Sequence, residues 1–149
     1  MSKAVVYFSA SGVTAGTAKQ LADAVGADVF EIRPEVPYTS ADLNWMDNGS
    51  RSSVEMKDRS FRPAIAKADY DLSGYDDVYI GFPIWWYTAP TIINTFIESV
   101  DLKGKRIALF ATSGGSTVRK AVEDLSAQYP ELNIVGGETL NGRVSGDIM

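Results

Sequence analysis

The chain has 149 residues, the length of a single domain. It contains no cysteine and no histidine, which excludes disulfides, Cys/His zinc sites, thiol nucleophiles and histidine general bases. The net charge of −5 argues against nucleic-acid binding through a basic face. The longest apolar run, residues 78–87, is too short for a membrane span. We therefore expect one cytoplasmic domain over residues 1–149, without a signal peptide, whose chemistry uses carboxylates, hydroxyls, backbone groups or a cofactor.

Strand and helix patterns alternate along the first half of the chain. The predicted elements are a strand over residues 4–8, a helix with Ala18, Leu21, Ala22 and Val25 on its apolar face, and a strand over residues 28–32. The first strand is apolar throughout, which is typical of a strand buried on both faces of a parallel sheet. Residues 34–74 contain three prolines and are irregular, and within them we expect a short helix between Ser40 and Arg59.

The same alternation continues in the second half. The predicted elements are a strand over residues 77–82, a helix from Pro90 to Val100, a strand over residues 106–111, a helix from Val118 that ends before Pro130, and a fifth strand over residues 132–135 that resumes over 138–140. Regular strand–loop–helix units predict an α/β fold with a doubly wound, five-stranded parallel sheet. Ligands of such sheets bind beyond the carboxyl ends of the strands.

The loop after the first strand combines hydroxyl side chains with one glycine. Its residues are Ser9, Ala10, Ser11, Gly12, Val13 and Thr14. Backbone N–H groups at a helix start and Ser/Thr hydroxyls are donors, so this loop suits a phosphate group held by neutral groups. A serine-rich helix cap without a ligand is the alternative. Walker A and G-x-G-x-x-G patterns are absent here, which excludes those nucleotide-binding loops.

Two further unusual loops follow the third and fourth strands. The second contains Pro83, Ile84, Trp85, Trp86 and Tyr87, and the third contains Thr112, Ser113, Gly114, Gly115 and Ser116. Three consecutive aromatic residues either pack inward over the core or present a face to a planar ligand. The third loop is either a simple turn with a helix cap or a source of backbone N–H groups for the edge of a flat ring.

A phosphate cradle, an aromatic wall and an amide-rich edge together describe a site for flavin mononucleotide (FMN). Over residues 3 to about 146 the sequence resembles the flavodoxin family, in particular its short bacterial flavodoxin-like branch. The resemblance implies a flavodoxin-like sheet of strand order 2-1-3-4-5. It also implies that Ser9, Ser11, Gly12, Val13 and Thr14 hold the phosphate, that Pro83, Ile84, Trp85 and Trp86 border the isoalloxazine ring, and that Thr112, Ser113, Gly114 and Gly115 lie at its other edge.

The chain departs from the family pattern at three places. Val13 replaces the usual asparagine of the phosphate loop, a change that weakens the pre-organisation of the loop but keeps the backbone donor. Tyr87 stands where relatives often have a small residue, so we expect it to narrow access to the ring. The chain ends at Met149, where similar proteins begin a last helix, so we expect that helix to be short or missing. One sheet face then needs a cover, from a partner, a homodimer mate or the long middle segment, unless the chain is truncated.

The function that these features imply is low-potential electron transfer by bound FMN, with no catalytic side chain and no metal. The acidic balance favours redox partner proteins, a reductase and an acceptor, with basic docking faces, and we expect neither nucleic acid nor membrane as a partner. One alternative is an FMN-dependent NAD(P)H or quinone oxidoreductase, in which residues 38–63 form a lid with Trp45, Met46, Arg51 and Arg59. Another is a regulatory module that has lost its flavin.

Overall fold

The computed structural model describes residues 3–9, 12–36, 38–39, 41–43, 46–47, 49–58, 60–66, 72, 74–85, 88–112 and 118–139, with only the backbone of Val13. The strands are β1 (Lys3–Tyr7), β2 (Asp28–Glu31), β3 (Asp77–Pro83), β4 (Arg106–Thr112) and β5 (Asn133–Thr139). The helices are α1 (Val13–Val25), α2 (Arg51–Lys57), α3 (Thr91–Ser99) and α4 (Arg119–Gln128). The short helix predicted between Ser40 and Arg59 is therefore present as α2.

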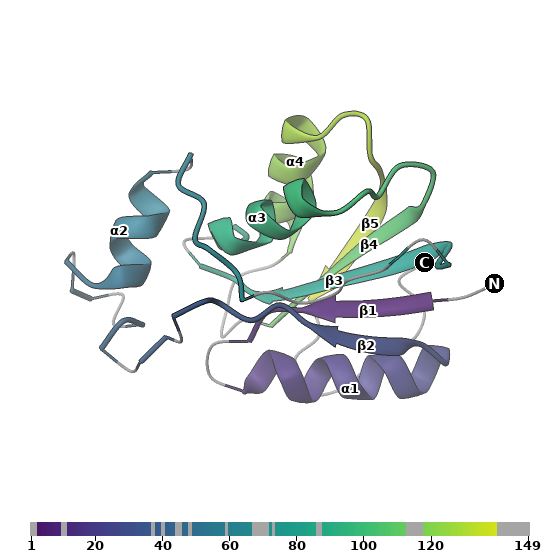
Figure 1. Cartoon of the computed structure of the whole chain (residues 1–149), viewed down its shortest axis with the longest axis horizontal. Helices are drawn as coiled ribbons and strands as arrows, with labels where there is room; N and C mark the ends of the chain where they lie inside the picture. Colours follow the sequence, from purple (N-terminus) through teal and green to yellow (C-terminus); the bar gives the residue numbers. More distant parts are fainter. Residues whose placement is uncertain are drawn as a thin grey trace.

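The five strands form one parallel sheet in the order β2-β1-β3-β4-β5, which confirms the predicted topology. In Figure 1, α1 covers one face of the sheet, whereas α3 and α4 cover the other. Helix α2 stands apart from both layers, beyond the ends toward which the strand arrows point. Because these are the carboxyl ends of the strands, α2 lies on the side where ligands of such sheets bind.

The last strand differs from its prediction. We expected a break at Gly136 and Gly137, but β5 is continuous, and its register with β4 shifts between Ile107 and Ala108 instead. A Cβ atom at Gly137 would lie 2.8 Å from a methyl of Val122 and 2.9 Å from the carbonyl oxygen of Leu109. This glycine therefore lets α4 approach the sheet closely and does not end the strand. The predicted short or missing last helix falls in residues 140–149, outside the described residues.

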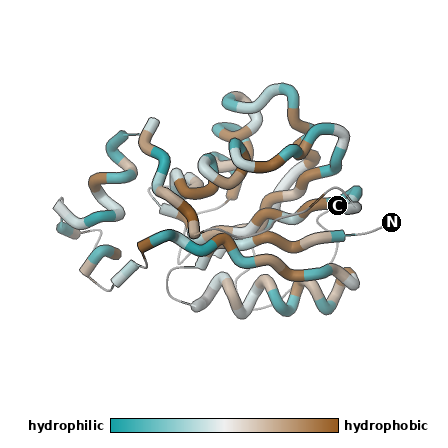
Figure 2. Tube along the Cα trace, in the orientation of Figure 1, coloured by the Kyte–Doolittle hydropathy of each residue, from teal (hydrophilic) through white to brown (hydrophobic). Residues whose placement is uncertain are grey.

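The core has two parts, one on each face of the sheet. Figure 2 shows hydrophobic residues concentrated along the strands. The larger part lies under α3 and α4, and the smaller part, which includes Tyr79, Ala108 and Phe110, lies on the α1 face. These three residues are buried, so the middle of the α1 face is not open. Among the described residues of β5, the exposed large hydrophobic side chain is Val135 (46%). No helix in the described part of the chain is both long and apolar enough to cross a membrane.

Candidate functional site

The carboxyl ends of β1, β3 and β4 bring the described parts of the three predicted loops together. The backbone N–H of Phe8, directly after β1, donates to the carbonyl of Gly81 on β3 at 2.9 Å. The N–H of Ile84, directly after β3, donates to the carbonyl of Thr112 at the end of β4 at 3.0 Å. Pro83 and Thr112, which we expected in loops, are the paired last residues of their strands. The candidate site is therefore built on strand ends, which fix its position.

The first loop has the geometry of an anion-binding helix start. Gly12, directly before α1, adopts φ = 93°, a left-handed conformation that favours glycine. Its N–H donates to the Ser9 hydroxyl oxygen at 3.0 Å, so the Ser9 O–H can donate outward. The first N–H groups of α1, from Val13 onward, have no acceptors within the helix, and the N-cap residue Gly12 has no side chain to cap them. Ser11 lies outside the described residues.

A hydroxyl pair joins the first loop to the third. The hydroxyl oxygens of Thr14 on α1 and Thr112 on β4 are 2.7 Å apart, and both side chains are buried. One hydroxyl donates to the other, so one hydroxyl hydrogen of the pair is left to donate elsewhere. We predicted both residues for the site, although in different roles, and did not predict that they bind each other. The rest of the third loop, Ser113, Gly114, Gly115 and Ser116, lies outside the described residues.

The second loop is anchored at both of its ends. Trp85 and Thr88 exchange backbone hydrogen bonds of 2.9 and 3.1 Å and form an antiparallel bridge. The Thr88 hydroxyl also donates to the Asp124 carboxylate on α4 at 2.6 Å, and Lys120 binds the same carboxylate oxygen at 2.8 Å. The two residues between the anchors, Trp86 and Tyr87, lie outside the described residues.

The indole of Trp85 packs inward, which is one of the two roles that we considered for the aromatic loop. Its ring meets the buried ring of Phe8 edge to face, with centroids 5.7 Å apart and planes at 87°. It meets Tyr38 in the same manner, at 5.4 Å and 74°. Because Trp85 is only partly buried, part of its surface remains open at the carboxyl edge of the sheet.

Sequence reasoning missed a cluster beside Trp85 that is made by Tyr38, Arg51 and Glu55. The Tyr38 hydroxyl donates to one carboxylate oxygen of Glu55, and the Arg51 Nε donates to the other at 2.9 Å. Burial, followed by the hydrogen bond to Glu55, raises the pKa of Tyr38 far above its usual value, so Tyr38 stays protonated. The i,i+4 spacing of Arg51 and Glu55 on α2 was the available sequence signal, but it does not indicate Tyr38 as the third member.

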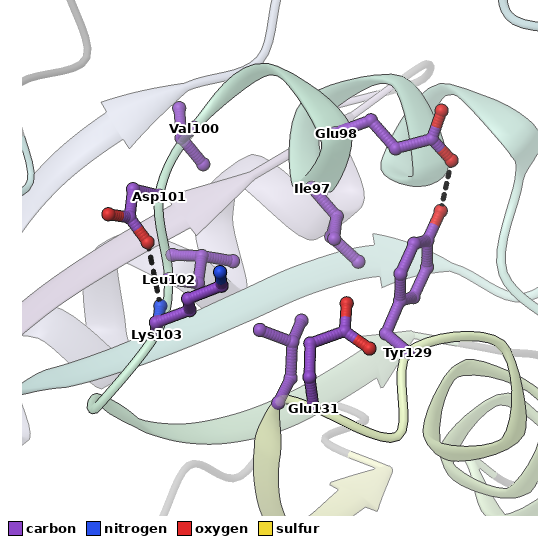
Figure 3. Close-up of a pocket in the computed structure, with 9 residues that line it drawn as sticks. Ile97, Glu98, Val100, Asp101, Leu102, Lys103, Tyr129 and Glu131 are labelled. Atoms are coloured by element: carbon purple, nitrogen blue, oxygen red, sulfur yellow. Dashed lines mark hydrogen bonds between the residues drawn. The ribbon is translucent and has the colours of Figure 1, made fainter.

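A cavity lies at the amino ends of β4 and β5. It has a volume of about 140 Å³ and is lined by the end of α3 and the connection between α4 and β5, including Glu98 and Tyr129 (Figure 3). Two of its lining residues bind each other, since the Tyr129 hydroxyl donates to Glu98. None of the predicted site residues lines this cavity. It is therefore separate from the candidate site.

The family model described as Flavodoxin matches residues 2–149. The chain belongs to the flavodoxin family. This membership confirms the resemblance and supports FMN as the cofactor that the three loops were predicted to bind. No curated protein matches the chain.

Solved structures agree with the assignment to the flavodoxin family. A "putative flavoprotein" from Bacteroides eggerthii is 50% identical with a TM-score of 0.94, over 97% of this chain and 91% of that one. A second "putative flavoprotein", from Bacteroides uniformis, is 51% identical with a TM-score of 0.93, over 98% and 93% of the two chains. A flavoprotein in complex with FMN from Lactobacillus acidophilus is 22% identical with a TM-score of 0.74, over 93% and 92%, and shares the fold.

Proposed function

We propose that the chain binds FMN at the carboxyl ends of β1, β3 and β4 and acts as a low-potential electron-transfer protein in the cytoplasm. The observation that carries the proposal is the convergence of Ser9, Trp85 and Thr112 through the backbone bonds Phe8–Gly81 and Ile84–Thr112. This convergence joins a neutral phosphate cradle to an aromatic loop on one rigid sheet edge. Flavodoxin-family membership supports the identity of the cofactor.

The chemistry of the donors fits the phosphate of FMN. The Ser9 O–H, the backbone N–H groups at the start of α1 and the remaining hydroxyl hydrogen of the Thr14–Thr112 pair are all neutral donors. The left-handed Gly12 turns the backbone at this point, and the space where a Cβ would lie is open. Ser11 and Val13 complete this loop in sequence. A phosphate dianion would therefore be held by dipoles at a helix start.

The second and third loops would hold the ring of the cofactor. Of the residues predicted for this role, Pro83, Ile84, Trp85 and Thr112 are described, whereas Trp86, Tyr87, Ser113, Gly114 and Gly115 lie outside the described residues. When bound, FMN supplies one- and two-electron redox chemistry that no side chain of this composition provides. The net charge of −5 and the aromatic environment both oppose additional negative charge in the site, which lowers the reduction potential.

The proposed partners are a reductase and an acceptor with basic docking faces. The acidic balance of the chain attracts such faces over long range and raises the rate of encounter. A homodimer stays a prediction, for which Val135 on β5 is the exposed apolar feature of the described part of that strand.

The alternative, an NAD(P)H or quinone oxidoreductase, requires a substrate site in the segment over residues 38–63. Within that segment, Arg51 is engaged by Glu55 and by the carbonyl of Val36 at 2.6 Å, so its guanidinium serves the packing of α2. Trp45 and Arg59 lie outside the described residues. These internal contacts favour the electron-carrier role.

Anaerobic reduction of the FMN-loaded protein separates the two functions. One sample is reduced by light-driven electron donation, and a second is mixed rapidly with NADPH, while the visible flavin absorbance is recorded. We expect complete reduction in the first sample and little bleaching in the second. Rapid bleaching by NADPH would support the oxidoreductase instead, and failure to bind FMN would exclude both.

A further inference from the structure

We propose that Tyr38, Arg51 and Glu55 form a clamp that holds the indole of Trp85 in one orientation at the FMN site. We call these three residues the α2 clamp, because Arg51 and Glu55 come from α2 and bind a side chain of the preceding segment. The inference rests on the proposed function and adds positioning residues to it. None of the three belongs to the predicted phosphate or ring contacts.

The clamp is built around a buried negative charge. The Glu55 side chain is only 5% exposed, and a carboxylate at such a place requires a positive partner and hydrogen bonds. Arg51 supplies the charge at 2.9 Å, and the Tyr38 hydroxyl supplies a further hydrogen bond. Because removal of one member leaves the others in an unfavourable environment, the three side chains depend on one another.

Arg51 fixes Tyr38 from a second direction. Its guanidinium carbon lies 3.8 Å from the centroid of the Tyr38 ring, which is a cation–π arrangement. Its Nη1 donates at 2.6 Å to the carbonyl of Val36, two residues before Tyr38, which attaches the backbone at that point to α2. The hydroxyl and one face of the Tyr38 ring are thus both held by α2.

The Tyr38 ring, which α2 holds, also contacts Trp85 at the candidate site. Tyr38, Trp85 and Phe8 contact one another edge to face, with centroid distances of 5.6 Å for Phe8–Tyr38, 5.4 Å for Tyr38–Trp85 and 5.7 Å for Phe8–Trp85. Phe8 is fully buried and directly precedes Ser9 of the phosphate loop, so it forms a fixed wall. Tyr38 forms the other wall. The partly buried indole of Trp85 is therefore set between the core and the clamp, at the entrance of the second loop.

The chain contains a matched control for this cluster. Tyr129, Glu98 and Arg62 make the same kinds of hydrogen bonds at a more exposed carboxylate, since the Tyr129 hydroxyl donates to Glu98 and Arg62 Nε donates to Glu98 at 3.0 Å. Glu98 and Tyr129 line the cavity at the amino ends of β4 and β5, away from the candidate site (Figure 3). Substitutions there remove the same kinds of bonds without touching Trp85.

The first arm of the test needs no cofactor. The ¹H–¹⁵N indole signal of Trp85 is recorded in the full chain without FMN and assigned by Trp85→Phe. We expect Glu55→Met and the milder Tyr38→Phe to shift or broaden it, whereas Glu98→Met and Tyr129→Phe leave it in place. An unmoved signal in both clamp variants, or an equal change in the control variants, would overturn the inference. Tyr38→Phe keeps the ring and the core, so the test does not depend on a variant with a buried unpaired charge.

The second arm measures the consequence at the site. Glu55→Met and Arg51→Met change the local charge in opposite directions, but both break the clamp. We expect both to weaken FMN binding about tenfold, by analogy with residues that orient metal ligands without touching the metal, and both to alter the visible circular dichroism of bound FMN. Opposite changes in affinity would indicate a direct charge effect and overturn positioning, as would wild-type affinity and spectrum in both variants. A wild-type chain that binds no FMN would overturn the proposed function, and the indole signal would still decide whether the clamp holds Trp85.

Discussion

The hydroxyl oxygens of Thr14 and Thr112 lie 2.7 Å apart, although 98 positions separate the two residues in sequence. The bond connects the first turn of α1 to the last residue of β4, and both side chains are buried. One side-chain contact across the site therefore fixes the position of the phosphate loop relative to the start of the third loop.

This contact can be measured by a double-mutant cycle. Thr14→Val and Thr112→Val each keep the side-chain shape and leave the other hydroxyl buried without its partner, so we expect each to lower the free energy of unfolding by about 1–3 kcal/mol. The double variant removes both hydroxyls, and its loss should be smaller than the sum. Urea unfolding of the cofactor-free protein measures all three values. Strict additivity would show that the two hydroxyls do not stabilise each other.

The left-handed conformation of Gly12 predicts a site-specific loss. Gly12→Ala meets no atom within 4 Å, but an L-residue at φ = 93° is strained by about 1–2 kcal/mol. The exposed loop can relieve this strain by moving, so we expect FMN binding to weaken several-fold in a fluorescence titration. Gly26→Ala at the other end of α1, at φ = 72° and equally open, is the control and should leave FMN affinity unchanged. Equal FMN affinities of the two variants would contradict a role of this turn in phosphate binding.

Gly81 is required by the packing of Phe110. A Cβ atom at Gly81 would overlap the ring of Phe110, which is fully buried on the α1 face. We expect Gly81→Ala to lower the free energy of unfolding by about 1–3 kcal/mol, because a packed core accepts extra volume poorly. A Cβ atom at Gly16 on α1 would meet no atom within 4 Å. Gly16→Ala is therefore expected to raise the free energy of unfolding by about 0.5–1 kcal/mol. A Gly81→Ala protein as stable as the wild type in urea would show that the ring can move at no cost.

The ion pair between Asp77 and Arg106 predicts a pH-dependent contribution to stability. Arg106 binds both oxygens of the buried Asp77 carboxylate, at 2.9 and 2.8 Å, and this lowers the pKa of Asp77 below its ordinary value of 3.8. A carboxylate with a lowered folded-state pKa stabilises the protein above its unfolded pKa, and this stabilisation is lost as the pH falls through the folded-state pKa. We expect Asp77→Asn to lower the free energy of unfolding by about 1.5–3 kcal/mol at pH 7.

The difference between Asp77→Asn and the wild type should shrink below about pH 4. Unfolding curves at several pH values measure it. The exposed pair of Arg119 and Glu123, 3.6 Å apart, provides the control, because Glu123→Gln should change the stability little at any pH. A constant difference down to the lowest accessible pH would contradict the role of the Asp77 charge.

The alternating apolar segments were sufficient to predict the elements, and the motif resemblance supplied the strand order, which the sheet confirms. The continuity of β5 was not predictable, since adjacent glycines usually indicate a turn. Here Gly137 is needed because Val122 of α4 and the Leu109 carbonyl approach the strand. That requirement depends on how α4 sits on the sheet, which local sequence does not contain.

At the candidate site too, local sequence did not contain the tertiary contacts. Strand ends and loop composition correctly indicated that residues near Ser9, Trp85 and Thr112 converge. They did not indicate the Thr14–Thr112 bond or the contact of Tyr38 with Trp85. Both contacts are tertiary, and Tyr38 lies in an irregular segment without periodicity.

Titration of the cofactor-free protein with FMN tests the central claim most directly. Aromatic side chains beside a bound ring quench its emission, so we predict that flavin fluorescence is quenched until one FMN is present per chain and rises in proportion to added FMN afterwards. Fluorescence that rises in proportion from the first addition would contradict FMN binding, and with it the electron-transfer function.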